Sequence, residues 1–201
     1  MAAKSERLTQ TTSVTRAIMA DKLGGLEIPS CDVCGKAAVV EQAYSGRVLC
    51  GHHLAKSIRK KVAKELRKQL ILKKGKHTTI FVAISGGKDS AALLELLVDI
   101  LGVRPDVTII AGTVDEGIEG YRPPSLQCAM DLCETLGVEF VTVTYKELGF
   151  EEMDTVAELI PGMKANNPSA PSMPCSYCGV FRRQGINHLA SKIDADVMAL
   201  G

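Results

Sequence analysis

The fold is decided by the stretch Ile80-Phe81-Val82-Ala83-Ile84-Ser85-Gly86-Gly87-Lys88-Asp89-Ser90. Its five apolar residues predict a buried strand, its last six residues a tight turn, and the apolar-rich run 91–101 a helix. The start of that helix presents unpaired N–H groups and the positive end of a dipole, while Gly86 and Gly87 let an anion approach the backbone. Lys88 adds a positive charge for phosphate oxygens. The stretch therefore predicts a phosphate site between a strand and a helix.

The loop differs from the Walker A motif. That motif reads G-x-x-x-x-G-K-[ST], whereas here an acid, Asp89, follows Lys88, so the signature of a P-loop kinase or GTPase is absent. The residues Ser85-Gly86-Gly87-Lys88-Asp89-Ser90 instead resemble the PP-loop of the ATP pyrophosphatase superfamily. Members of that superfamily grip the β,γ-pyrophosphate of ATP, transfer AMP to a carbonyl-type oxygen and let a nucleophile displace it. The alternative is a solvent-exposed glycine turn between a core strand and a core helix.

Composition narrows the class of protein. With 201 residues, 46% apolar and 23% charged, the chain can bury one substantial core and a small appended module. No run approaches the roughly 18 apolar residues of a membrane span, and the N-terminus lacks an apolar signal core, so we expect a soluble protein. Seven cysteines without such a signal indicate metal or thiol chemistry in a reducing, cytoplasmic compartment.

The first cysteines have the spacing of a zinc finger. Cys31-Asp32-Val33-Cys34 is followed, after fifteen residues, by Cys50-Gly51-His52-His53. Each pair forms a knuckle, and two knuckles supply the four corners of a tetrahedral zinc site, Cys31, Cys34, Cys50 and one histidine. The Cys-x-x-His spacing favours His53 over His52. Four protein ligands leave no open position, so the zinc would be structural; a chance cluster of free thiols is the alternative.

A basic helix follows the finger. Apolar residues recur every four positions from Leu54 to Leu70, which predicts an amphipathic helix over 54–72, and residues 56–76 hold ten Lys or Arg against one acid. Such a run is either a solvated face or a contact for RNA phosphates, and beside a zinc knuckle and a phosphate loop we favour RNA. The candidate RNA-binding residues are Lys56, Arg59, Lys60, Lys64, Arg67 and Lys68.

The remaining pattern predicts an α/β domain with a parallel sheet and helices on both faces. Further strands are expected at 106–114, 138–144 and 195–200, helices at 126–136 and 150–159, a turn at 121–125, a hairpin at 43–48 and a long mobile loop at 161–174. Ligands of open α/β sheets lie beyond the carboxyl ends of strands, so Val114 would flank an adenine. The alternative is an ordinary strand-exit loop with two solvated acids, Asp115 and Glu116.

A second cysteine pair starts the next expected helix, which runs to about residue 192. Cys175 and Cys178 stand in a Cys-x-x-Cys at a helix start, an arrangement suited to metal or redox chemistry. A solvated thiol pair and half of a second zinc site are the alternatives. Cys128 and Cys133 lie within the expected helix 126–136, and we interpret both as small buried hydrophobes.

Four domains are expected. Residues 1–30, which are polar and rich in Thr and Ser, form a flexible extension with a short helix-compatible patch at 14–23. The zinc finger takes residues 31–53, the basic linker helix 54–76 and the PP-loop ATPase domain 77–201.

Together these motifs resemble the tRNA 2-thiolation enzymes of the TtuA/TtcA superfamily, in the archaeal and eukaryotic cytoplasmic branch that thiolates the wobble uridine. The resemblance covers residues 31–201 and rests on the finger, the PP-loop, Asp115-Glu116-Gly117-Ile118 and Pro174-Cys175-Ser176-Tyr177-Cys178-Gly179. It implies an adenine nucleotide alpha-hydrolase-like fold. It also implies that ATP adenylates the C2 oxygen of a tRNA uridine and that sulfur then replaces AMP, with pyrophosphate and AMP as products.

The resemblance further implies cofactors and site residues. Cys175 and Cys178 would ligate an iron–sulfur cluster, 4Fe-4S, together with a third cysteine further along; zinc would occupy the finger, and Arg182 would lie near the ATP phosphates. The nucleotide would be lined by Ala83, Ser85, Gly86, Gly87, Lys88, Asp89, Ser90, Val114 and Gly201. Charge alone suggests Asp89 as a Mg²⁺ ligand. The partners would be tRNA, a sulfur donor and a second copy of the chain. The sulfur donor would be either a ubiquitin-like thiocarboxylate carrier or free sulfide.

The resemblance also has gaps. The third cluster cysteine, an acidic loop after the fourth strand and a C-terminal zinc finger would all lie beyond Gly201, so we expect a member that lacks its C-terminal part. Cys128 or Cys133 replaces the third cysteine only if the fold brings that helix close. Two other functions remain open: another PP-loop AMP-forming ligase or amidotransferase with zinc at Cys175 and Cys178, and a non-catalytic zinc-finger module that binds tRNA.

Overall fold

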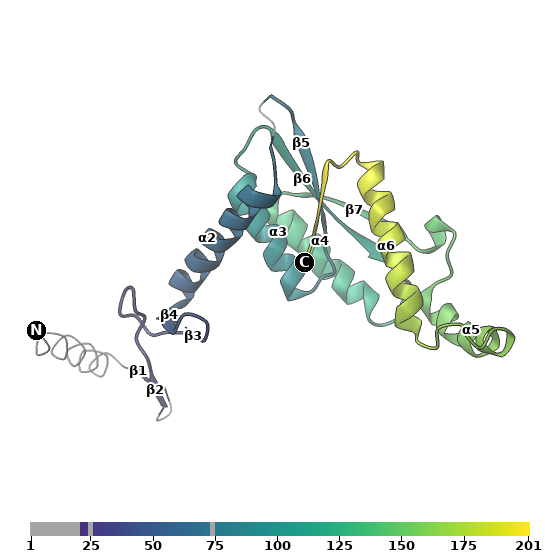
Figure 1. Cartoon of the computed structure of the whole chain (residues 1–201), viewed down its shortest axis with the longest axis horizontal. Coiled ribbons are helices and arrows are strands. Elements are labelled where there is room, and N and C mark those ends of the chain that lie inside the picture. Colours follow the sequence, from purple (N-terminus) through teal and green to yellow (C-terminus); the bar gives the residue numbers. More distant parts are fainter. Residues whose placement is uncertain (1–20, 24–25, 73–74) are drawn as a thin grey trace, which may run out of the picture. The chain divides into compact units, whose positions relative to one another are not determined.

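The computed structural model describes residues 21–23, 26–72 and 75–201, and the chain divides into two compact units, residues 1–70 and 71–201 (Figure 1). Most of the predicted flexible extension, and of its helical patch, lies outside the described residues. At the end of that patch Asp21–Leu23 (β1) is a strand and not a helix, since it pairs antiparallel with Leu26–Ile28 (β2) and so satisfies its backbone groups.

The first unit is a hairpin followed by a long helix. Val40–Gln42 (β3) and Arg47–Leu49 (β4) pair antiparallel, which confirms the predicted hairpin. The hairpin is longer than the predicted range 43–48, because β3 precedes that range and β4 ends one residue after it. The helix Gly51–Gln69 (α2) begins three residues earlier and ends three residues earlier than predicted. It starts early because Cys50 already has the extended backbone of an N-cap residue (φ −73°, ψ 165°).

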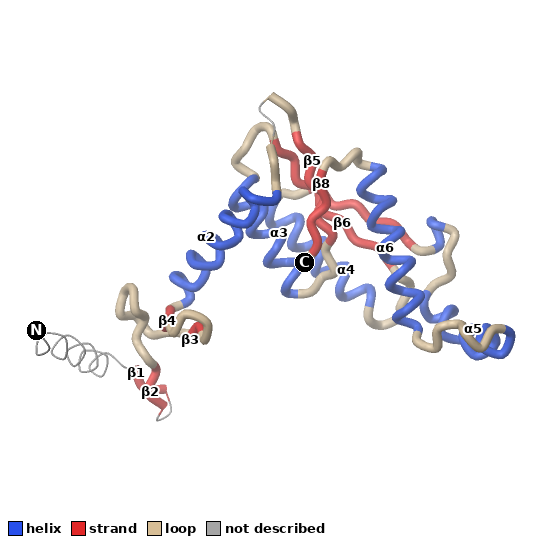
Figure 2. The backbone as a smooth tube through the Cα atoms, viewed as in Figure 1, coloured by secondary structure: helices blue, strands red, loops and turns tan. Residues whose placement is uncertain are grey.

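The second unit is built on a four-stranded sheet. The strands Thr78–Ala83 (β5), Val107–Asp115 (β6), Glu139–Thr144 (β7) and Val197–Leu200 (β8) lie in the order β7-β6-β5-β8, and every neighbouring pair is parallel (Figure 2). This confirms the predicted parallel sheet. The apolar run of β5 occupies the buried centre, where Phe81 and Val82 are fully inaccessible.

Helices cover both faces of that sheet. Lys88–Leu101 (α3) and Arg122–Leu136 (α4) pack together and against β6, whereas Pro174–Lys192 (α6) packs against β6 and β7 from the other side (Figure 1). A short 3-10 helix, Lys146–Leu148 (η1), and Met153–Asn166 (α5) connect β7 to α6. None of the helices within the described residues has the length and apolarity that crossing a membrane requires.

Two boundaries in the second unit differ from prediction. Helix α4 begins at Arg122 inside the predicted turn 121–125, because prolines in its first turn need no N–H partner. Helix α5 runs through the exposed Pro161 to Asn166, so the predicted long loop 161–174 is shortened to residues 167–173. The helix continues because its apolar face, including the buried Ile160, packs in the core, and this packing outweighs the backbone hydrogen bond that proline removes.

Candidate functional site

The four predicted zinc ligands converge. The ligand atoms of Cys31, Cys34, Cys50 and His53 all lie within 4.8 Å of one another. Cys34 Sγ is 3.7 Å from Cys50 Sγ, and His53 Nδ1 is 3.3 Å from Cys50 Sγ and 3.6 Å from Cys31 Sγ. Ligands bound to a tetrahedral zinc at about 2.0–2.3 Å would be about 3.3–3.8 Å apart. The group therefore fits zinc, and the ligand is His53, not His52.

The knuckle favours the thiolate form at Cys31 but not at Cys34, where, against a backbone hydrogen bond from Lys36, partial desolvation and the sulfurs of Cys50 and Cys31 raise the pKa of the thiol. Burial opposes ionisation of Cys31, but N–H groups of Cys50, Val33 and Cys34 outweigh it and lower the pKa of the Cys31 thiol to about 6. His53 lies in the first turn of α2. The metal knuckle is thus continuous with the basic helix.

The predicted RNA-binding side chains line the exposed part of α2. All six are exposed, whereas Ala63 of the same helix is buried and Leu54, Val62 and Leu66 are half-buried. Lys68 pairs with Glu65 at 2.9 Å, an interaction of little energy between exposed groups. The helix therefore offers its positive charge to solvent.

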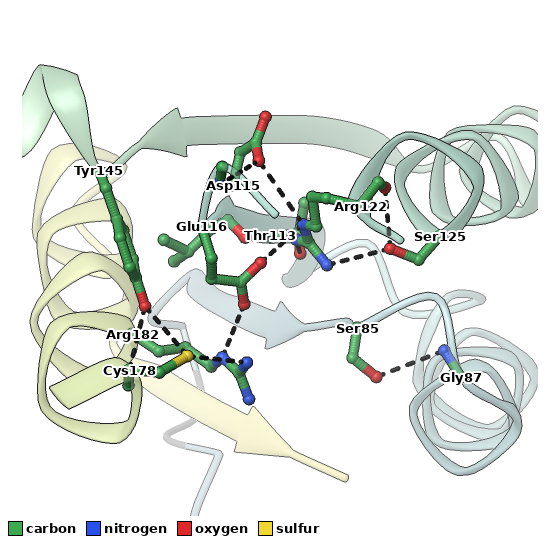
Figure 3. A network of polar contacts seen from close by, with 12 residues as sticks. Ser85, Gly87, Thr113, Asp115, Glu116, Arg122, Ser125, Tyr145, Cys178 and Arg182 are labelled. Carbon is green, nitrogen blue, oxygen red and sulfur yellow. Dashed lines mark hydrogen bonds and ion pairs between the residues drawn. The ribbon is translucent and has the colours of Figure 1, made fainter. Parts of the chain in front are cut away.

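Hydrogen bonds within the loop shape the predicted PP-loop. Ser90 Oγ accepts from the Ser85 N–H (3.1 Å) and donates to the Gly87 carbonyl (3.0 Å). The Gly87 N–H donates to Ser85 Oγ at 3.3 Å (Figure 3). Gly86 has a φ of +80°, and a Cβ there would lie 2.2 Å from the Ser125 carbonyl oxygen, so only glycine fits. Helix α3 has no side-chain cap at its start, which leaves its first N–H groups for an anion.

Lys88 and Asp89 lie at the start of α3 and are exposed to solvent. Their side chains are 87% and 80% exposed, and Lys88 Nζ lies 2.9 Å from both carboxylate oxygens of Asp89. Such an exposed pair is weak. Lys88 is therefore free to leave Asp89 and bind a phosphate, and Asp89 is free to leave Lys88 and bind a cation.

A cavity of about 250 Å³ lies beyond the carboxyl ends of β5, β6 and β8. Its position matches the switch point of a doubly wound sheet, because the chain runs outward from β5 to β7 and then returns to pair β8 on the other side of β5. Among its lining residues are the predicted nucleotide residues Ala83, Ser85, Ser90, Val114 and Gly201, and also Arg182. A second cavity, of similar volume, is lined by Gly86, Gly87, Lys88 and Cys128.

Two charged residues at this cavity were missed by sequence reasoning. Glu116 and Arg122 are 3% and 4% exposed, and both line the cavity. Glu116 Oε1 accepts a hydrogen bond from Arg182 Nε at 2.7 Å, and Oε2 lies 2.8 Å from Arg122 Nε (Figure 3). The alternative of a strand-exit loop with two solvated acids is therefore wrong for Glu116. The prolines after Arg122 mark a helix start, but nothing in the local pattern indicates its burial.

The second cysteine pair is asymmetric. Both residues lie in the first turns of α6, as predicted, but Cys175 is exposed and Cys178 is buried. Arg182 Nη2 lies 3.3 Å from Cys178 Sγ, while the Tyr145 hydroxyl lies 3.5 Å from Sγ and donates to the Cys178 carbonyl at 3.0 Å. Burial raises the pKa of Tyr145, and so does its contact with Cys178, which keeps the hydroxyl a donor.

No third ligand accompanies this pair in the described parts of the chain. There, the only group of three or more Cys, His, Asp or Glu placed to share a metal ion is the N-terminal one. Cys133 is buried on α4 as predicted, whereas Cys128 is exposed, which contradicts its interpretation as a buried hydrophobe. The fold therefore does not bring either cysteine to Cys175 and Cys178.

Comparison with known proteins identifies similar sequences across both units. The family model of the 2-thiouridine synthetase TtuA N-terminal LIM domain matches residues 30–55. The tRNA 2-thiolation protein NcsA of Haloferax volcanii is 37% identical over 175 residues, which are 85% of this chain and 52% of that protein. Cytoplasmic tRNA 2-thiolation protein 1 of Anopheles gambiae is 28% identical over 88% of this chain and 48% of its own length.

A solved structure gives the same result. The U34-tRNA thiolase NcsA from Methanococcus maripaludis, determined with its 4Fe-4S cluster, has a TM-score of 0.70 and 31% identity over 86% of this chain and 53% of that one. The chain spans about half the length of these relatives. Over that half, the resemblance to the NcsA-type tRNA 2-thiolation proteins that the motifs predicted is confirmed.

Proposed function

We propose that this chain carries the nucleotide-binding and sulfur-handling part of an ATP-dependent tRNA 2-sulfurtransferase. ATP would transfer AMP to the C2 oxygen of a uridine with loss of pyrophosphate; sulfur then forms the new bond to C2 as the C2–O bond breaks and AMP leaves. One observation carries the proposal: Arg182 lines the cavity of the phosphate loop and also contacts Cys178 Sγ. A single side chain therefore borders the proposed phosphate site and contacts a cysteine thiol.

The loop would bind and orient ATP. The N–H groups at the start of α3 and of the Gly86–Gly87 backbone would donate hydrogen bonds to the β,γ-phosphate oxygens, while Lys88 and Arg182 would neutralise their charge. Asp89 would exchange Lys88 for Mg²⁺. The backbone at Ala83, Val114 and Gly201, which lines the cavity, would hold the nucleoside together with the loop serines Ser85 and Ser90.

The cysteine pair would supply two ligands of an iron–sulfur cluster. Cys175 and Cys178 fit this role because both lie in the first turns of α6, three positions apart, and the solved NcsA relative carries a 4Fe-4S cluster. Two thiolates are fewer than such clusters need, so a complete cluster site would have ligands besides these two. When bound, the cluster would hold the incoming sulfur beside the activated uridine.

The first unit would bind tRNA. Zinc in the Cys31, Cys34, Cys50, His53 knuckle would order the start of α2, whose basic side chains contact RNA phosphates. The names of relatives support a cytoplasmic location and tRNA as the substrate. A thiocarboxylate carrier or free sulfide would be the sulfur donor, and a homodimer the assembly.

The nucleotide role is tested by Lys88→Ala. Because Lys88 is 87% exposed, the change should leave folding and zinc content unchanged, while removal of its charge should weaken ATP binding at least about tenfold and abolish pyrophosphate release. Calorimetric ATP titration and a pyrophosphate assay with tRNA measure both. Lys192→Ala, an exposed lysine on α6, is the matched control. Wild-type binding and release by Lys88→Ala would remove the loop from this role.

The RNA role is tested by the salt dependence of tRNA binding. Replacing Lys60 and Lys64 together by alanine should weaken binding to different tRNAs equally and lower the slope of log K against log salt by about 1–2. An unchanged slope would assign the charge run to a solvated face. Binding of tRNA without any nucleotide turnover would instead support the non-catalytic module.

A further inference from the structure

The buried carboxylate of Glu116 lies between two arginines that line the nucleotide cavity. It directly follows β6, and its two oxygens face opposite neighbours: Oε1 faces Arg182 of α6, and Oε2 faces Arg122 at the start of α4 (Figure 3). A buried carboxylate is stable as an ion only beside such positive charge. Glu116 thus connects helices on opposite faces of the sheet through one side chain.

The backbone that carries Glu116 is held on both sides. The Met153 N–H, at the start of α5, donates to the Glu116 carbonyl at 2.9 Å. The Gly117 N–H donates to Asp115 Oδ1 at 3.0 Å, and Gly117 takes a φ of +64° that turns the chain away from β6. The carboxylate therefore reaches the cavity from a constrained position.

The two arginines differ in what else holds them. Arg122 is buried and also donates to Thr113 Oγ1, the Val114 carbonyl and Ser125 Oγ. Its Nε and Glu116 Oε2 are at ion-pair distance but are not aligned as a hydrogen bond. The aligned bond of the carboxylate is the one to Arg182.

Arg182 depends on Glu116 for its orientation. Its side chain is 49% exposed, and the interactions found for it in the structure are those with Glu116 and with Cys178, one turn earlier on α6. With Nε bonded to the carboxylate, the planar guanidinium directs Nη2 at Cys178 Sγ. Without that bond, a long half-exposed side chain gains many rotamers.

We propose that Glu116 is a positioning residue, whose carboxylate holds the Arg182 guanidinium against the sulfur of Cys178 and at the wall of the nucleotide cavity. The part of this inference that concerns nucleotide rests on the proposed function, whereas the part that concerns sulfur does not. If Glu116 acts through Arg182, removing either partner must have the same effect on Cys178, and removing both must add little.

The first experiment follows alkylation of each cysteine by iodoacetamide in nucleotide-free, zinc-loaded protein, using mass spectrometry. Arg182→Gln should change the rate constant at Cys178 by at least about threefold, Glu116→Gln should reproduce most of that change, and the double variant should differ from either by less than about 1.5-fold. The matched control is Glu119→Gln, an exposed acid on the same loop, which should leave the rate unchanged.

Two other cysteines report on competing explanations. Cys175 is exposed and should react equally in all variants, and Cys133, which is 1% exposed on α4, should stay slow. A rise at Cys133 in parallel with Cys178 would mean a loosened core and overturn the proposal. So would an unchanged Cys178 rate in Glu116→Gln, or independent, additive effects of the two substitutions.

The second experiment measures ATP affinity in the wild type, Arg182→Gln, Glu116→Gln and the double variant. Arg182→Gln should weaken ATP binding about fivefold or more in the wild-type background but less than about twofold in Glu116→Gln, because Arg182 is no longer held there. Equal losses in both backgrounds would overturn the nucleotide part. If ATP does not bind to the wild type, the proposed function fails, while the alkylation result still decides the role of Glu116.

Discussion

The chain contains two cysteine pairs of identical spacing whose surroundings differ. Cys31 and Cys34 face two further ligand residues, with all four ligand atoms within 4.8 Å. Cys175 and Cys178 have no such partners among the described residues; one thiol is exposed, and the other touches Arg182 and Tyr145. The first pair completes a closed site for one ion, whereas the second leaves positions open.

This difference shows that Cys-x-x-Cys spacing defines a knuckle but not its chemistry. A closed tetrahedral set stabilises a fold and excludes substrate. An incomplete set, beside a cation and a phosphate loop, can accept a cluster and an incoming reactant. The four predictions below test whether the two pairs differ in this way.

The largest effect is expected at the closed site. Cys50→Ala should lower zinc from about one per chain to near zero and unfold the first unit, because structural zinc contributes about 10–16 kcal/mol to the folding of finger peptides. Metal analysis and limited proteolysis measure this. Cys128→Ala, at an exposed cysteine outside the group, is the control. Wild-type zinc content in Cys50→Ala would show that the four residues do not form the site.

The open pair should bind a different metal. In protein prepared under strict exclusion of oxygen, Cys175→Ser should remove iron and acid-labile sulfide and leave zinc unchanged, since Cys175 lies outside the N-terminal group. Elemental analysis gives all three quantities per chain. Two zinc ions in the wild type and one in Cys175→Ser would make the pairs alike and favour the zinc-bearing ligase.

A smaller effect is expected from the hydroxyl beside Cys178. Tyr145→Phe keeps the ring but removes the hydrogen bond from the hydroxyl to the Cys178 carbonyl within α6, so it should destabilise the second unit by about 0.5–1.5 kcal/mol. Thermal unfolding should shift by a few degrees. Tyr121→Phe, at a ring that is 64% exposed, should leave the transition unchanged. Equal transitions for both variants would show that the hydroxyl does not stabilise this environment.

The smallest effect is a dependence on alkaline pH. Burial raises the pKa of Tyr145 above its ordinary value of 10.0, so the unfolded chain loses this proton before the folded one does. The contribution of the group is therefore complete below pH 10 and is lost as the pH rises further. Between pH 10 and 11 the urea midpoint of the wild type should fall more steeply than that of Tyr145→Phe. Parallel slopes would contradict a buried, neutral hydroxyl.

Residue spacing and local sequence pattern were sufficient to predict the zinc site, the PP-loop and the parallel sheet. The zinc ligands lie within one short segment, so their spacing was sufficient. The PP-loop was equally predictable, because its strand, glycine turn and helix are consecutive in the sequence. Glycine is required at Gly86 by its positive φ and by the close approach of Ser125. The parallel sheet followed from the alternation of strands and helices.

Contacts between distant segments account for what was missed. Arg122 and Glu116 look like surface residues in the sequence, and only the meeting of β6, α4 and α6 buries them as a pair. Pro161 marked a helix end, but packing of the apolar face of α5 carries the helix past it. Nothing in the sequence indicated that Tyr145 contacts the second cysteine pair, since Cys178, to which its hydroxyl donates, lies 33 residues away.

The sheet order has a consequence for how the chain is made. The zinc ligands Cys31 and His53 are 22 residues apart, whereas Asp196, which anchors β8 beside β5, is 117 residues from its partner Thr79. At ribosomal rates of about 5–20 residues per second, the finger can close on the order of ten seconds before β8 emerges. Until then one edge of β5 has no strand beside it. A nascent chain stalled in that interval would expose this edge, and chaperones should recognise it there.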